Sequence, residues 1–142
     1  MTFLSIPIFI YQIQSTEAMS NITNQSSLSG LISEGQALLN SSRFEEALVT
    51  YDKVLMIDST SVDALNGKGL TLNQLGKYDE AITWFDKALE INPDFIDAMY
   101  NKADALGELG KYEESLEWTD RALTLKPAMQ NNSNSNVLVP ND

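Results

Sequence analysis

Two stretches of this sequence decide its fold: "LGKYDEAITWFDKALEINP", from Leu75 to Pro93, and "LGKYEESLEWTDRALTLKP", from Leu109 to Pro127. Each position of the second stretch lies 34 residues after its counterpart in the first. One further step of the same length, backwards from Tyr78, reaches Phe44, so a weaker copy precedes them. A constant period of this length is typical of proteins built from stacked repeats. The sequence therefore predicts a domain of three units, at residues 28–61, 62–95 and 96–127.

The second half of the middle unit has the hydrophobic pattern of a helix. Its apolar residues recur with a spacing that places them on one helical face. They are Ala81, Ile82, Phe85, Ala88, Leu89 and Ile91. The first half of the unit follows the same pattern, and no strand pattern occurs between residues 28 and 127. We therefore expect an all-α domain of helix–turn–helix units.

Glycine and proline predict where these helices end. Gly76 and Gly110 stand at the expected end of the first helix of a unit, because glycine adopts the left-handed conformation that follows many helices. Pro93 and Pro127 stand at the expected end of the second helix, since the residue before proline is pushed out of the helical region. In the first unit Ser42 replaces the glycine, which makes this copy the weakest.

The composition excludes several classes of function. The chain has 142 residues, with 20 acidic and 9 basic side chains and a formal net charge of −11. This balance argues against nucleic acid or an anionic membrane as a partner, because both require clustered Lys and Arg. The absence of Cys and His removes disulfides, thiolate nucleophiles, imidazole bases and Cys/His metal sites. We expect no catalytic activity, cofactor or metal, since the carboxylate pair Asp104 and Glu108 is commonplace on acidic helices.

The two ends of the chain differ from the repeats. Residues 1–27 combine an apolar run, too short to span a bilayer as a helix, with a polar linker. The run has three interpretations: a signal peptide, a segment before a true start at Met19, or an extended segment that packs on the domain or a partner. The first would make the protein secreted; otherwise we expect a cytoplasmic protein. Residues 128–142 are rich in Asn and Ser and predict a flexible tail.

Residues at equivalent places in the three units connect the chain with a known family. A small residue recurs on the first helix, an aromatic at the turn, a small residue early in the second helix and a later aromatic that fails in the last unit. These are Gly35, Gly69 and Ala103; Phe44, Tyr78 and Tyr112; Ala47, Ala81 and Ser115; and Tyr51, Phe85 and Thr119. The chain resembles the tetratricopeptide repeat (TPR) proteins. The resemblance implies a right-handed superhelical α-solenoid of three TPR units.

The resemblance also implies a concave groove, lined by the first helices, that binds other proteins. Ile32, Gln36, Asn40 and Leu70 belong to this lining. The polar candidates for peptide binding are Asp63, Asn66, Asn73, Asp97, Tyr100, Asn101, Asp104 and Glu108. Their chemistry predicts that the groove binds an extended peptide or partner helix of basic or neutral-polar character. The side-chain amides of Asn66, Asn73 and Asn101 would form hydrogen bonds with its backbone. The alternative is that these acids are only the solvated face of an acidic protein.

One familiar type of TPR groove is excluded. TPR domains that grip the C-terminal carboxylate of heat-shock chaperones resemble one another in a clamp of Lys, Arg and Asn side chains. The corresponding positions here are Ile32, Gln36, Gly67, Asp97 and Asn101, and none of them is a cation. Asp97 would repel a carboxylate, so we expect no clamp of this type.

Two further features leave the partner open. Trp84 and Trp118 occupy the same repeat position and are expected to pack on a neighbouring second helix, although a convex patch for self-association is the alternative. The sequence after Pro127 does not supply a polar capping helix for the last unit, which leaves three alternatives: Val137-Leu138-Val139 folds back, the unit frays, or another chain covers it. The N-terminal apolar segment could also cover an exposed edge. We predict a non-catalytic protein-interaction module, an adaptor or scaffold; the alternative is a self-associating structural or assembly module.

Overall fold

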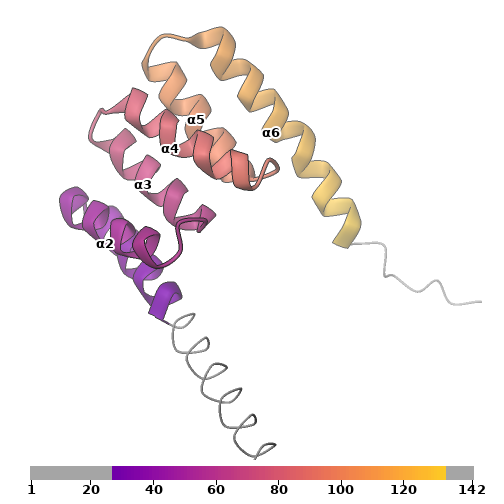
Figure 1. The fold of residues 1–142 in the computed structure, drawn as a ribbon. Helices are drawn as coiled ribbons and strands as arrows, with labels where there is room; N and C mark the ends of the chain where they lie inside the picture. The colour runs from indigo at the N-terminus through magenta and orange to yellow at the C-terminus, as the bar shows by residue number, and fades with distance from the viewer. Residues whose placement is uncertain (1–26, 134–142) are drawn as a thin grey trace, which may run out of the picture.

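The structure is a computed structural model that describes residues 27–133. Residues 27–40 form a helix, which is followed by α2 (Phe44–Ile57), α3 (Val62–Gln74), α4 (Tyr78–Ile91), α5 (Ile96–Glu108) and α6 (Tyr112–Ser133). Successive helices run antiparallel and stack in chain order, with α2 near one end and α6 at the other (Figure 1). Within the described part of the chain there is no strand, so the expected all-α class is confirmed. The number of repeat units stays a prediction.

The turn inside each helix pair has the same backbone conformation. Ser42, Gly76 and Gly110 have φ of 58°, 73° and 75°, the left-handed region that glycine adopts without strain. The next residue closes each turn, its amide donating to a carbonyl five residues earlier, as from Lys77 to Leu72 at 2.9 Å. The predicted turns are therefore present, and the first copy keeps this conformation although a serine occupies the glycine position.

The turn between pairs depends on a short polar side chain at the helix end. The Oδ1 atoms of Asp58 and Asn92, 34 residues apart, accept hydrogen bonds from the amides of Thr60 and Asp94. The third such position is Lys126, which has no acceptor atom on its side chain. Helix α6 continues past this point to Ser133, so the end expected at Lys126-Pro127 is wrong. A proline alone does not end this helix; the preceding pairs also have a side chain that stabilises the turn.

The buried aromatics explain the small residues of the first helices. A Cβ atom added to Gly69 would lie 2.6 Å from the ring of Phe85, and one added to Gly35 would lie 2.8 Å from the ring of Tyr51. In the third pair Ala103 takes the glycine position and Thr119 the aromatic one. The helices thus cross closely enough to exclude even a methyl group wherever an aromatic ring lies between them.

Burial also raises the pKa of the Tyr51 phenol.

Candidate functional site

The eight predicted peptide-binding residues lie on α3 and α5, which contact one another directly. One cavity of about 320 Å³ is bounded by the helix at 27–40, α3 and α5. Its lining includes three of the predicted binding residues and three of the other groove positions: Asp63, Asn66, Asp97, Ile32, Gln36 and Leu70. The structure therefore brings together side chains that are up to 65 positions apart, from Ile32 to Asp97, on one continuous surface.

A second cavity lies further along the first helices, where α5 meets α6. It has a volume of about 380 Å³ and contains Tyr100, Asp104 and Glu108 of the predicted set. Tyr112 and Thr119 of α6 line its other side. Six of the eight predicted binding residues thus divide between two hollows, both lined by α5, and Asn73 and Asn101 line neither.

Hydrogen bonds between first helices use the amides that were expected to meet a peptide. The Nδ2 of Asn101 donates to Oδ1 of Asn66 at 2.9 Å, and the Nδ2 of Asn73 donates to Oδ2 of Asp104 at 2.7 Å. Asn73 is only 6% exposed, and its Oδ1 is buried without a hydrogen-bond partner among the described atoms. Asn73 is therefore a link between α3 and α5 and not a surface donor. Asn66 and Asn101 are half-buried and stay at the groove surface.

The lysines nearest the groove are engaged elsewhere. Lys68 forms an ion pair with Asp52 at 2.5 Å, and its ammonium lies 4.0 Å from the ring centre of Trp84. Lys102 repeats this arrangement in the next pair, with Asp86 and Trp118. Both cations are thus held by residues of the second helices.

The acids of the groove have no such compensation. Asp63 and Asp97 are exposed, and neither forms an ion pair among residues 27–133. Each lies in the first turn of its helix, where a carboxylate also interacts favourably with the helix dipole. These two unpaired carboxylates give the groove a negative potential. The position of each carboxylate in the first turn of a helix contributes to stabilising its charge.

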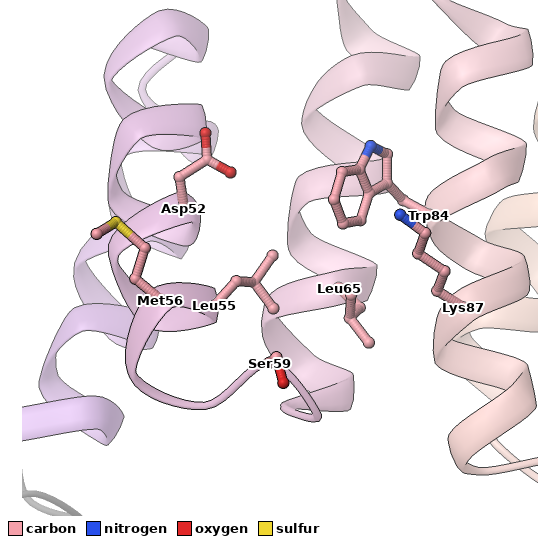
Figure 2. A pocket seen from close by; sticks show the side chains of 7 residues that line it. All are labelled: Asp52, Leu55, Met56, Ser59, Leu65, Trp84 and Lys87. Carbon is pink, nitrogen blue, oxygen red and sulfur yellow. The ribbon is translucent and has the colours of Figure 1, made fainter.

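The opposite surface has a larger hollow that the sequence did not predict. Figure 2 shows Leu55 of α2 and Trp84 of α4 extending toward each other above Leu65, with Lys87 and Asp52 at the rim. The hollow measures about 550 Å³. Trp84 packs here on the buried cluster that contains Leu65 of α3, a first helix, so its packing on a neighbouring second helix stays a prediction. At the next junction along the chain, the guanidinium of Arg121 donates a hydrogen bond to the carbonyl of Pro93 at 3.4 Å. The residues 34 positions earlier are Lys87 and Ser59, which both line this hollow.

This fold and groove define an α-helical repeat protein. Two family models, both described as tetratricopeptide repeat, match residues 62–95 and 84–117. The first match coincides with the middle unit predicted from the period. The two matches together cover residues 62–117, so the chain contains tetratricopeptide repeats. A search of curated proteins finds no match.

Solved structures share the fold at low sequence identity. The crystal structure of MamA aligns with a TM-score of 0.67 and 21% identity over 73% of this chain, which spans 61% of the MamA chain. The first TPR of Spaghetti (RPAP3), bound to the HSP90 peptide SRMEEVD, aligns with a TM-score of 0.67 and 22% identity, over 70% of this chain and 79% of the RPAP3 chain. The Yersinia enterocolitica type III secretion translocator chaperone SycD aligns with a TM-score of 0.69 and 21% identity, over 76% of this chain and 84% of the SycD chain. These structures show the fold, and the match to the repeat family supports a general role in protein binding.

Proposed function

We propose that this protein is an adaptor or scaffold that binds an extended peptide of basic or neutral-polar character in the groove lined by α3 and α5. The observation that carries the proposal is the cavity between Asp63 and Asp97, two exposed carboxylates without ion pairs in the described structure. Leu70 and Ile32 add apolar surface to the same cavity. A segment with a cation beside a small apolar side chain matches this combination.

The groove disfavours an acidic peptide such as the one bound to the RPAP3 domain. No cation stands at the positions of a carboxylate clamp, and Asp97 occupies one of them. The nearest lysines, Lys68 and Lys102, are paired with Asp52 and Asp86. The similar fold is therefore compatible with a different partner charge, because the charges belong to groove side chains and not to the packing positions.

The test uses the full chain and a labelled short peptide of alternating Lys and Ser, with fluorescence anisotropy as the readout. The double variant Asp63→Lys and Asp97→Lys should weaken binding at least about tenfold, because two attractive charges become repulsive. The double variant avoids Asp104, whose loss would also break the bond to Asn73.

The matched control reverses two charges away from the groove, Asp79→Lys and Glu90→Lys on α4, both exposed. Its net charge equals that of the groove variant, so it reports the non-specific attraction of an acidic protein. Equal binding by the two variants would show that the groove acids are only a solvated face.

A further inference from the structure

Helix α6 repeats an apolar stripe that α4 buries. On α4 the stripe consists of Tyr78, Ile82, Phe85 and Leu89, and α5 covers it: Phe85 packs with Ala105, and Leu89 with Met99. The equivalent residues of α6 are Tyr112, Leu116, Thr119 and Leu123, here called the open α6 face. Leu89 is 8% exposed, whereas Leu123 is 50%, Leu116 61% and Tyr112 74% exposed. No described helix follows α6 to cover it.

A series of ion pairs shows what the covering helix supplies. The carboxylate of Asp52 on α2 pairs with Lys68 on α3, and Asp86 on α4 pairs with Lys102 on α5, both at 2.5 Å. The third member of the series is Asp120 on α6, exposed and without an ion pair in residues 27–133. At each earlier junction the next helix thus brings a lysine to the aspartate of the helix that it covers.

Acidic side chains border the open α6 face on both sides. Glu108 of α5 lines the same hollow as Tyr112 and Thr119. Asp120 lies on the other side, one turn from Leu116 and from Leu123 along the helix. An apolar stripe with a carboxylate on each side is complementary to an amphipathic helix that has basic flanks.

We propose that the open α6 face binds an amphipathic helix of a partner protein, in the way that α5 covers α4. Apolar side chains of the partner cover Leu116 and Leu123, and a Lys or Arg of the partner pairs with Asp120. This surface is separate from the proposed peptide site between Asp63 and Asp97, so either site can fail without the other.

The charges favour a different protein over this chain itself as the occupant. Residues 1–26 and 134–142 contain no Lys and no Arg, so neither segment can supply a basic side chain to Asp120. A second copy would bring together two α6 helices whose first turns both carry Glu113 and Glu114. It would also join two chains of formal charge −11, which repel each other.

The probe for this site is a labelled peptide with the sequence of residues 95–110, which natively covers α4. Asp104→Lys and Glu108→Lys in the peptide give it the basic flank, and it retains Lys102, the partner of Asp86. Fluorescence anisotropy with the full chain should show saturable binding. The same peptide with Lys102→Glu should bind at least about tenfold more weakly, because a repulsive charge then faces Asp120.

Variants of the protein locate the site. Leu116→Glu with Leu123→Glu should abolish binding, and Asp120→Lys should weaken binding of the original peptide but restore that of the Lys102→Glu peptide. Val49→Glu on α2, where the valine is 55% exposed, is an apolar-to-acidic control away from this face and should bind normally. All four sites are exposed, so circular dichroism should show unchanged folding.

Three outcomes would overturn the proposal. Unchanged binding by the Leu116→Glu, Leu123→Glu variant would place the peptide elsewhere. A wild-type dimer in sedimentation that this variant dissociates would make a second copy the occupant. Tighter peptide binding after deletion of residues 1–26 would show that the chain covers this face with its own segment.

Discussion

Helices α4 and α6 occupy the same place in the repeat but have different surroundings. Helix α4 lies between α3 and α5, while α6 packs on α5 alone among the described helices. Phe85 of α4 is fully buried, and its counterpart Thr119 is half-buried. The loss of the aromatic in the last unit therefore coincides with the loss of a covering helix.

The same comparison connects residues on different helices. Gly69 faces Phe85 at a distance that excludes a methyl group, whereas Ala103 stands in the pair that has Thr119. A large side chain on the second helix thus requires a glycine on the first, and a smaller one permits alanine. Packing within a unit and packing between units are therefore coupled through one aromatic position.

The largest expected difference between the two helices is in the core. Phe85→Ala should lower the free energy of unfolding by about 3–5 kcal/mol, because it leaves a cavity in a fully buried site. Thr119→Ala should change it by less than about 1 kcal/mol, since its hydroxyl only donates to the Ser115 carbonyl within the helix. Urea unfolding followed by circular dichroism measures both. Equal losses would mean that α6 is packed as tightly as α4.

The close helix crossing predicts the next largest effect. Gly69→Ala should destabilise the protein by about 1–3 kcal/mol through the clash with the Phe85 ring, despite the higher helix propensity of alanine. Combined with Phe85→Thr, it should cost clearly less than the sum of the two single changes. Additive losses in the double-mutant cycle would show that the ring does not limit this position.

The ion-pair series predicts a smaller, salt-dependent difference. Asp86→Asn should cost up to about 1 kcal/mol at low ionic strength, because it removes the partner of the mostly buried Lys102. Asp120→Asn should be nearly neutral in the free protein, since Asp120 has no ion pair in the described structure. Repeating the urea unfolding at high salt should reduce the first value and leave the second unchanged. A clear loss for Asp120→Asn would reveal a partner within the chain.

The smallest effect concerns the turns between helix pairs. Hydrogen bonds from the Thr60 hydroxyl and amide lower the pKa of Asp58 below its unfolded value. The ionised carboxylate therefore adds stability above the unfolded pKa, and this contribution disappears as the pH falls through the folded pKa. Asp58→Asn, which installs the residue found at position 92, should keep the turn and remove this pH dependence. Urea midpoints across the acidic range test this, and an identical acid dependence in the variant would contradict it.

Much of the fold could be predicted because the information is local and repeated. The helical stripes, the left-handed turn residues and the small residue beside each aromatic recur at the same interval, so each copy supports the others. The end of α6 could not be predicted from Pro127 alone, because the turn also depends on the side chain at position 126. The difference is visible in the sequence, because Asp58 and Asn92 have a side-chain acceptor at this position and Lys126 has none.

The groove was predicted as a set of positions, but not as a set of contacts. Asp63, Asn66 and Asp97 line one cavity, as their places on the first helices indicate. The burial of Asn73 and its bond to Asp104 depend on how α3 and α5 approach each other, which no sequence spacing specifies. The hollow beside Trp84 depends in the same way on the distance between α2 and α4.

The helix class, the period and the resemblance to the repeat family follow from the sequence alone, because hydrophobic spacing and turn chemistry act over a few neighbouring residues. The packing of the helices determines which of the repeated side chains remain available. It holds Lys68 and Lys102 on the second-helix side, buries Asn73, and leaves Leu116, Asp120 and Leu123 exposed. These outcomes depend on whether a further helix packs against each one. Copies that are nearly the same in sequence therefore have different surfaces at the middle and at the end of the stack.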